Sequence, residues 1–339
     1  MQEFQNLISE SVPLSWIVLI ASFAILAKCA DIFVGSSVSL AQMLKIPKLV
    51  VGIVLVSLAT TAPELSVSLA AALRGNPEMA LGNAIGSVIC DDGLAMGLCG
   101  LLTVAVIKID RRTFRLSAGF LLLCQAAILL FVAPDRTLSR IEGLGLVAMF
   151  IAYTFYLFHE HKAGKLETDP IEINMHAPKT HRLSQIVALF VLALGGIVLA
   201  SEFIITSATS IAHSFGIPEA VIALSLVALG TSIPEIATCI AAARKNEGAI
   251  AVGNILGADI MNICWVAGAS AIANNLTLGD REIYFMFPWM LFIVGVMLIS
   301  MRLGYTLTKR KGALLLALYI LYIASFFLVY SSDASSRLL

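Results

Sequence analysis

Two glutamates lie in the middle of apolar segments, in settings that repeat along the chain. Glu64 ends the run Ala-Thr-Thr-Ala-Pro-Glu, and Glu235 ends the run Gly-Thr-Ser-Ile-Pro-Glu. A carboxylate placed in hydrocarbon costs at least about 2.5 kcal/mol, and no basic residue lies one helical turn from either glutamate. Such a pair favours cation binding. The alternative is a protonated glutamic acid that holds helices together by hydrogen bonds.

A proline precedes each glutamate. Because proline has no N–H, Pro63 and Pro234 cannot bond to the carbonyls four residues back, on Ala59 and Gly230. Free carbonyls at membrane depth are tolerated where they line a cavity or meet an ion. An ordinary proline kink capped by a hydroxyl is the alternative. The hydroxyls that lie beside these carbonyls belong to Thr60, Thr61, Thr231 and Ser232.

A second motif, Gly-Asn-x-x-Gly, follows each glutamate and leads to more oxygen donors. Ser87 and Asp91 are one helical turn apart and should share a face, and Asn262 follows the second copy. All of these donors are oxygens, which suits a hard cation such as Ca2+ and disfavours transition metals. The expected ligand set is Glu64, Glu235, Asp91, Asn262, Thr60, Thr231, Thr61, Ser232, Ser87, Ala59 and Gly230.

The motifs belong to an internal repeat in which every matched pair is separated by 171 residues. No insertion or deletion is needed over the matched region. The pairs are Pro47 and Pro218, Thr60 and Thr231, Pro63 and Pro234, Glu64 and Glu235, Gly82 and Gly253, Asn83 and Asn254, Gly86 and Gly257, and Gly97 and Gly268.

The composition places this repeat in a membrane. Of 339 residues, 59% are hydrophobic and 13% charged, and a soluble protein could not cover so much apolar surface. The formal net charge is zero, so nothing indicates nucleic-acid binding. The six cysteines form no CxxC pair, which disfavours a zinc site or a disulfide framework.

About ten segments are long and apolar enough to cross a bilayer as helices. Their continuous apolar runs exclude a β-barrel. If the N-terminus is outside, the inner loops hold sixteen of the 22 Lys and Arg residues, as the positive-inside rule requires; both termini are then outside. The segments are 14–44, 48–73, 79–107, 116–134, 141–158, 184–213, 219–243, 248–273, 284–301 and 312–331.

Five segments per half is an odd number, so the second copy should enter the membrane from the opposite side. The predicted fold is an all-α membrane protein with ten transmembrane helices in two inverted five-helix repeats, residues 1–158 and 183–339. Inverted repeats are typical of secondary transporters, whose sites lie where broken helices meet. The cytoplasmic linker 159–182 holds four of the five histidines, and we interpret it as a solvated connection rather than a metal sensor.

These motifs resemble the α-repeats of the sodium/calcium exchanger family, in both halves of the chain. Gly-Thr-Ser-x-Pro-Glu is present at 230–235, and 59–64 is a variant of it. The resemblance implies that Glu64 and Glu235 bind Ca2+ centrally, and that flanking positions bind Na+ with help from hydroxyls and carbonyls. Asp91 and Asn262 take the remaining side-chain positions, in swapped order relative to archaeal members, and Ala258 replaces a serine.

The predicted function is antiport of Ca2+ against Na+ by alternating access; exchange of Ca2+ or another divalent cation against H+ is the alternative. Gly86 and Gly257 stand where the proton-coupled branch of the superfamily has glutamate, which favours Na+. No HExxH or comparable constellation suggests an enzyme, and inverted repeats disfavour a channel. We expect no cofactor, a monomer in the lipid bilayer, and a multi-pass location in the plasma (inner) membrane.

Three charged residues lie beside these motifs. Lys28 is expected either to neutralise Asp31 or Asp92, or to extend its side chain towards the membrane surface. Asp92 and Asp259 add acids next to the second motif, and the sequence assigns them no role.

Overall fold

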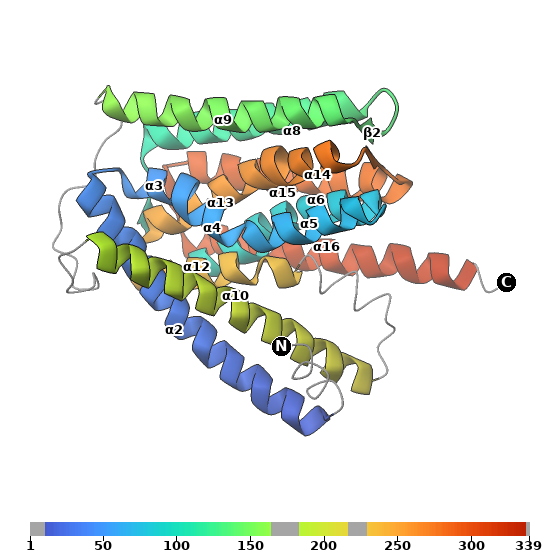
Figure 1. Cartoon of the computed structure of the whole chain (residues 1–339), viewed down its shortest axis with the longest axis horizontal. Coiled ribbons are helices and arrows are strands. Elements are labelled where there is room, and N and C mark those ends of the chain that lie inside the picture. Colours follow the sequence, from blue (N-terminus) through green and yellow to red (C-terminus); the bar gives the residue numbers. More distant parts are fainter. Residues whose placement is uncertain (1–10, 164–182, 216–228, 337–339) are drawn as a thin grey trace.

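A computed structural model describes residues 11–163, 183–215 and 229–336. The first half is helical apart from two very short strands (Figure 1). Its elements are α2 (Val12–Leu44), α3 (Lys48–Val51), the π-helical turn η1 (Gly52–Val56), α4 (Ser57–Thr60), α5 (Ala62–Leu73), α6 (Pro77–Cys90), the π-helical turn η2 (Asp91–Ala95), α7 (Met96–Leu102), β1 (Ile107–Lys108), α8 (Arg111–Val132), β2 (Thr137–Leu138) and α9 (Arg140–Lys162).

The second half repeats this order of elements over its described residues. Several helices begin 171 residues after their counterparts: α12 corresponds to α5, α13 to α6, and η3 to η2. The elements are α10 (Leu183–Ser214), α12 (Ile233–Arg244), α13 (Gly248–Met261), η3 (Asn262–Ala267), α14 (Gly268–Ala273), β3 (Leu276–Thr277), η4 (Glu282–Met286), α15 (Phe287–Arg302), β4 (Thr306–Leu307) and α16 (Lys309–Ser336).

Seven helices in the described part of the chain are long and apolar enough to cross a membrane. An eighth span is formed if the helix pair Lys48–Thr60 and Ala62–Leu73 is taken as one bent element. The predicted segments 219–243 and 312–331 are not among these spans, and the first of them lies partly outside the described residues. The multi-pass, all-helical fold is therefore confirmed, while the number of ten helices stays a prediction.

The bend in the eighth span coincides with the motif that ends in Glu64. α4 ends at Thr60, α5 begins at Ala62, and the two helices meet at 46°. Thr61 between them has φ −80° and ψ 3°, and its counterpart Ser232 has φ −82° and ψ 2°. Because Pro63 lies in the first turn of α5, where a missing N–H is harmless, the chain breaks one residue before that helix. The break that the prolines predicted is present in both copies.

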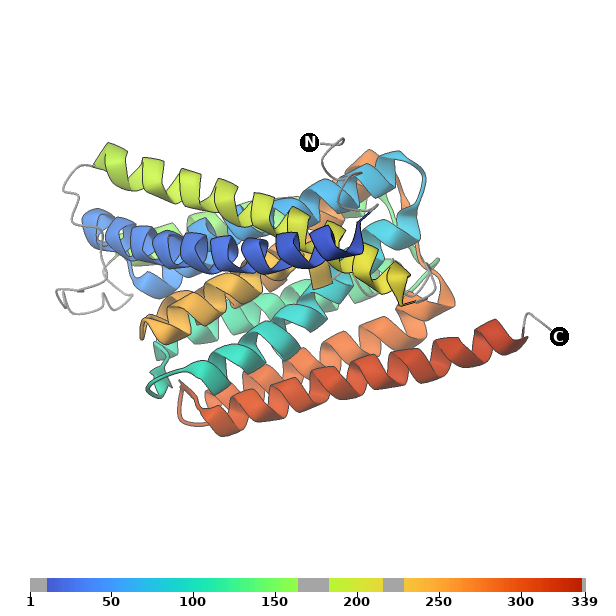
Figure 2. The ribbon, with the colours of Figure 1, turned by 90° about the horizontal axis from the view of Figure 1, so that it is seen from below.

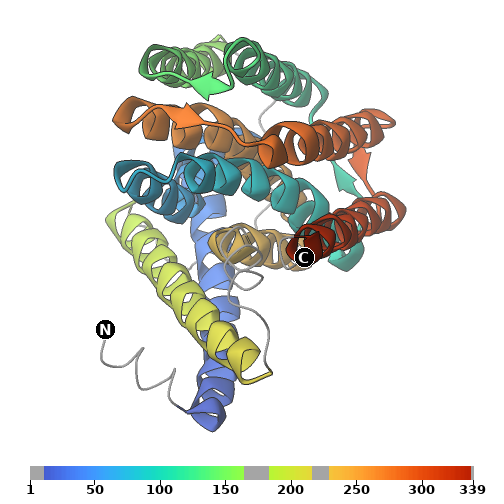
Figure 3. The ribbon, with the colours of Figure 1, turned by 90° about the vertical axis from the view of Figure 1, so that its right-hand side faces the viewer.

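The helices form layers around the broken spans. In Figure 1, α8 and α9 lie side by side along one face, and α2 and α10 cross the opposite face. Figure 3 shows the same order end-on, with the broken helices of both halves in the middle of the bundle. The faces of α5 and α12 that carry Glu64 and Glu235 are thus buried within the bundle.

Two antiparallel strand pairs connect the halves. β1 pairs with β4 through Ile107 and Leu307, and β2 pairs with β3 through Thr137 and Thr277. α8 lies between β1 and β2 in the chain, so the two pairs lie at opposite ends of the bundle. Each pair joins a loop of the first half to a loop of the second.

Glycine allows the halves to approach closely beside the helix break. A Cβ on Gly253 would lie 2.3 Å from the Leu49 carbonyl oxygen, and one on Gly257 would lie 2.3 Å from the Ile53 carbonyl oxygen. No side chain fits at such distances, so α13 packs backbone to backbone against α3 and η1. This contact fixes the second motif of one half against the broken span of the other.

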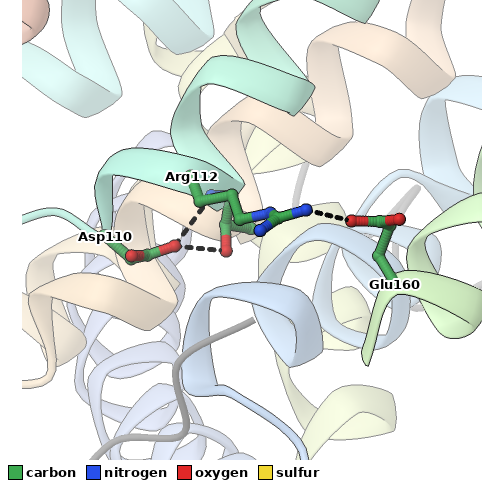
Figure 4. A network of polar contacts seen from close by, with 4 residues as sticks. Asp110, Arg112 and Glu160 are labelled. Atoms are coloured by element: carbon green, nitrogen blue, oxygen red, sulfur yellow. Dashed lines mark hydrogen bonds and ion pairs between the residues drawn. The ribbon is translucent and has the colours of Figure 1, made fainter. Parts of the chain in front are cut away.

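Polar networks secure the helix ends at the rim of the bundle (Figure 4). Asp110 caps α8, and its Oδ1 accepts a hydrogen bond from the Thr113 N–H at 2.7 Å. Arg112 on the first turn of α8 forms an ion pair with Glu160 near the end of α9, also at 2.7 Å. The buried Glu160 carboxylate therefore has a cationic partner, which ties α8 to α9.

Candidate functional site: unpaired carboxyls at the helix breaks

Three carboxyl groups from the two halves meet near the helix breaks. Glu64 lies on the first turn of α5, Glu235 on the first turn of α12, and Asp91 at the start of η2. All three side chains are 0% exposed, and the three carboxyls are close enough to interact electrostatically. Three acids are thus gathered in a region sealed from solvent.

These carboxyls lack the partners that buried acids need. Both oxygens of Glu64, both of Asp91 and Oε2 of Glu235 receive no hydrogen bond; Oε1 of Glu235 accepts one from the Thr61 hydroxyl at 3.3 Å. No Lys, Arg or His is buried among the described residues. A buried ionised carboxylate without a partner is strongly unfavourable, so the cluster calls for a cation or a proton.

Three other buried acids in the described ranges show the contrast. Each forms an ion pair with a basic residue near an end of the bundle. The pairs are Glu160 with Arg112, Glu247 with Lys48 and Glu282 with Arg281. The chain therefore supplies basic partners to its rim acids but not to those at the helix breaks.

Hydroxyls and amides link the halves around the acids in a symmetric pattern. Thr60 donates to Oδ1 of Asn254 at 3.0 Å, and its repeat counterpart Thr231 donates to Oδ1 of Asn83 at 3.3 Å. The hydroxyl of Ser87 also lies 3.4 Å from that of Thr231. Each broken helix is thereby held against the second motif of the other half.

Most of the remaining predicted ligands lie at or near this cluster, but Asn262 also borders an apolar gap. Ser232 faces the Asp91 carboxyl, and its hydroxyl has no hydrogen-bond partner within the described structure. Ala59 and Gly230 are buried at the ends of the broken segments, and their carbonyls cannot bond to the prolines four residues on. Asn262 begins η3 as Asp91 begins η2, but it borders a small apolar gap beside α6, α8 and α15.

Three polar residues near the acids were not among the predicted ligands. Asn83 and Asn254 accept hydrogen bonds from the threonine hydroxyls, and their 171-residue spacing is the sequence signal that points to them. Tyr319 of α16 packs over Gly93, and its phenol interacts with Cys90 and Asp91. No sequence spacing connects Tyr319 to the repeat, so only the fold could reveal it.

The donor set fits a hard cation, provided that neutral oxygens take part. No group of three or more His, Cys, Asp and Glu side chains in the described ranges is arranged to hold a metal ion unaided. Carboxylates, hydroxyls and free carbonyls together do supply the many oxygens that Ca2+ or Na+ prefers. The thiols of Cys90 and Cys239 also interact with these acids, but oxygens make up most of the donor set.

One sequence hypothesis is wrong. Lys28 is exposed on α2, whereas Asp92 is fully buried and neither of its oxygens has a hydrogen-bond partner in the described part of the chain. Lys28 therefore does not neutralise Asp92. Within these ranges no ion pair joins Lys28 to Asp31 either, so the exposed position of Lys28 agrees with a side chain that extends towards the membrane surface.

The sequence matches the model of one protein family over most of its length. The match to "Sodium/calcium exchanger protein" covers residues 14–159 and 185–328, and so includes both glutamate motifs and both second motifs. The chain belongs to this family. Its members are transporters, and this membership confirms the resemblance found in the repeat motifs.

Individual exchanger-family proteins agree with this assignment. The chain is 28% identical to the sodium/calcium exchanger MaX1 of Methanosarcina acetivorans, over 94% of this chain and 100% of MaX1. It is 35% identical to the inner membrane protein YrbG of Escherichia coli, over 75% of this chain and 78% of YrbG. The fold matches the sodium-calcium exchanger NCX_Mj soaked with Na+ and Sr2+, with a TM-score of 0.79, 26% identity, and coverage of 93% and 99% of the two chains.

Proposed function

We propose that this protein exchanges Ca2+ for Na+ across the membrane by alternating access. The observation that carries the proposal is the cluster of Glu64, Glu235 and Asp91, which is fully buried, unpaired with any basic side chain among the described residues, and shared by both halves. MaX1 and NCX_Mj are named as sodium/calcium exchangers, which supports the same choice of ions.

Charge balance explains why one site would serve both ions. Like-charged carboxylates in a low-dielectric region cannot stay ionised together without cations. About three Na+ would balance the three negative charges, and one Ca2+ would balance two of them, so each ion species excludes the other by occupying the same carboxylates. The two ions would therefore bind in turn, which is the basis of exchange.

The residues would have distinct roles in this cycle. Glu64 and Glu235 come from different halves, so a cation between them draws the two broken helices together. Thr61, Ser232, Thr60, Thr231 and Ser87 would supply hydroxyl oxygens, while Ala59 and Gly230 would supply carbonyl oxygens. Without a bound cation the carboxylates repel one another, and their charge opposes passage of the empty site through the closed state.

An inverted repeat would provide the two access states. The recurrence of α5, α6 and η2 as α12, α13 and η3 supports this arrangement. The strand pairs and the ion pair of Lys48 with Glu247 also support it, because each joins loops that ten crossings would place on the same side. Two similar halves inserted in opposite directions give two conformations of comparable energy, open to opposite sides.

The position of the basic residues extends the proposal to orientation. Sixteen of the 22 Lys and Arg residues fall on one side of ten crossings, which would be the cytoplasmic side of the plasma (inner) membrane. Both termini would then be outside. A single chain contains both halves of the site, so we propose that the monomer is the transporting unit.

The test is 45Ca uptake into proteoliposomes that hold the purified chain, with Na+ and H+ gradients imposed separately. An outward Na+ gradient should drive uptake in the absence of a pH gradient, and the ionophore monensin, which dissipates the Na+ gradient, should abolish it. Unpaired carboxyls also accept protons, so H+ is the competing counter-ion. Uptake driven by a pH gradient alone would assign the protein to Ca2+/H+ exchange instead.

A further inference from the structure

A second pair of buried acids lies next to the proposed transport site. Asp92 on η2 and Asp259 on α13 are both 0% exposed, and their carboxyls interact directly with each other. None of their four oxygens receives a hydrogen bond from any residue that the structure describes. Two buried carboxyl groups that interact without a hydrogen-bond donor require a cation or a proton between them.

This pair does not follow from the repeat. The counterpart of Asp92 is Ile263, and the counterpart of Asp259 is Val88. Ile263 is 3% exposed and Val88 is 0% exposed, so the same places in the other half pack well with apolar side chains. The two acids are therefore additions to the architecture, and helix packing does not require them.

Asp91 connects the pair to the proposed transport site. Its carboxyl interacts with Glu235 on one side and with Asp92 on the other, and Asp259 also interacts with it. Both Asp91 oxygens are buried and receive no hydrogen bond in the described structure. Ions that neutralise Glu64, Glu235 and Asp91 would still leave two acidic side chains without compensation.

We propose that Asp92 and Asp259, which lie beside Asp91, form a second cation site that takes an alkali-metal ion. A monovalent ion fits better than a divalent one, because two carboxyls supply few of the roughly 6–8 oxygens that Ca2+ takes and no hydroxyl donates to them in the described part of the chain. The adjacent Asp91 makes the two sites interdependent, since an ion at the second site reduces the repulsion that Asp91 exerts on Glu235. The proposal rests on the proposed function only for the identity of the ion at the first site.

The experiment tests the second site in a variant whose first site has lost its two central carboxylates. In the Glu64→Gln/Glu235→Gln variant, thermal unfolding is followed in detergent while NaCl or KCl replaces choline chloride at constant ionic strength. A ligand that binds only the folded state raises Tm, so NaCl, KCl or both should raise it saturably, by at least about 2 °C. The salt that raises Tm identifies the ion that binds at the second site.

Adding Asp92→Asn and Asp259→Asn to that variant should abolish the rise in Tm. The matched control adds Glu160→Gln instead, which removes a buried carboxylate that already has Arg112 as its partner; it should leave the rise intact. Two results would overturn the proposal. In the first, Tm of the Glu64→Gln/Glu235→Gln variant does not respond to alkali-metal ions, which is the result expected if Asp92 and Asp259 share a proton. In the second, the response survives Asp92→Asn/Asp259→Asn.

A second measurement applies if the combined variants do not fold. Equilibrium binding of 22Na+ and 86Rb+ to the otherwise unchanged chain should fall by one ion per molecule in Asp92→Asn/Asp259→Asn, and an unchanged count would contradict the proposal. The transport test has a different readout, so the two proposals can fail separately. A chain without Na+-driven Ca2+ uptake could still bind an alkali-metal ion at Asp92 and Asp259.

Discussion

At the rim of the bundle, the buried carboxylate of Glu160 lies 2.7 Å from the Arg112 guanidinium. At the helix breaks, the buried carboxyls of Glu64 and Asp91 have no basic partner among the described residues. Both regions bury negative charge, but only the rim supplies the positive charge from the chain itself. An ion pair within the protein is permanent, whereas acids without a basic partner can be neutralised by an exchangeable cation. The difference agrees with a structural role for the rim and with the proposed exchange site at the breaks.

Removing the central charges should have the largest effect. Glu64→Gln and Glu235→Gln should each reduce Na+-driven 45Ca uptake by at least about 100-fold, since each removes a ligand from the core of the site. The same variants should unfold at an equal or higher temperature in ion-free buffer, because an unpaired buried charge has been removed. Full uptake by either variant would contradict the assignment of these acids.

Removing the basic partner of a rim acid should have the opposite effect, a loss of stability without a loss of transport. Arg112→Ala leaves Glu160 buried without its cation and should lower the free energy of unfolding by about 2 kcal/mol, because Arg112 itself is half exposed. Uptake per folded molecule should remain near that of the unchanged protein. The double variant Arg112→Ala/Glu160→Gln should regain most of the lost stability in the same denaturation assay; if it does not, the ion pair is not the cause.

A smaller effect is expected from the hydroxyl that bonds to a central acid. Thr61→Val removes the donor to Oε1 of Glu235 and should weaken the apparent Ca2+ affinity in uptake assays about tenfold, the equivalent of one hydrogen bond to a charged group. Ser66→Ala is the matched control, because the exposed Ser66 hydroxyl bonds only to the carbonyl of Ala62 in its own helix. Equal affinities in the two variants would remove Thr61 from the site.

The smallest effect should come from restoring symmetry between the halves. Ala258 occupies the position that Ser87 holds in the first half, and it is fully buried. Ala258→Ser adds a neutral oxygen and should increase the apparent Na+ affinity about threefold, with little change for Ca2+. The Na+ dependence of uptake measures this. A loss of Na+ affinity would indicate that the position is too tightly packed to act as a ligand.

Much of this arrangement could be predicted from the sequence because the repeat has a constant spacing. The burial of Glu64 and Glu235, the breaks before Pro63 and Pro234, and the single face shared by Ser87 and Asp91 all follow from local rules of helix geometry. Which helix faces another depends on rotations that no local pattern encodes. The contacts of Tyr319, the pairing of Asp92 with Asp259 and the exposure of Lys28 therefore required the fold.

The two strand pairs bear on whether the chain can be produced as two separate polypeptides. β1 with β4 and β2 with β3 fasten one half to the other at both ends of the bundle, independently of any peptide bond between them. The interlocked glycines of α13 add a third fastening. A gene divided between the codons for residues 163 and 183 would thus encode two polypeptides that carry their own means of reassociation.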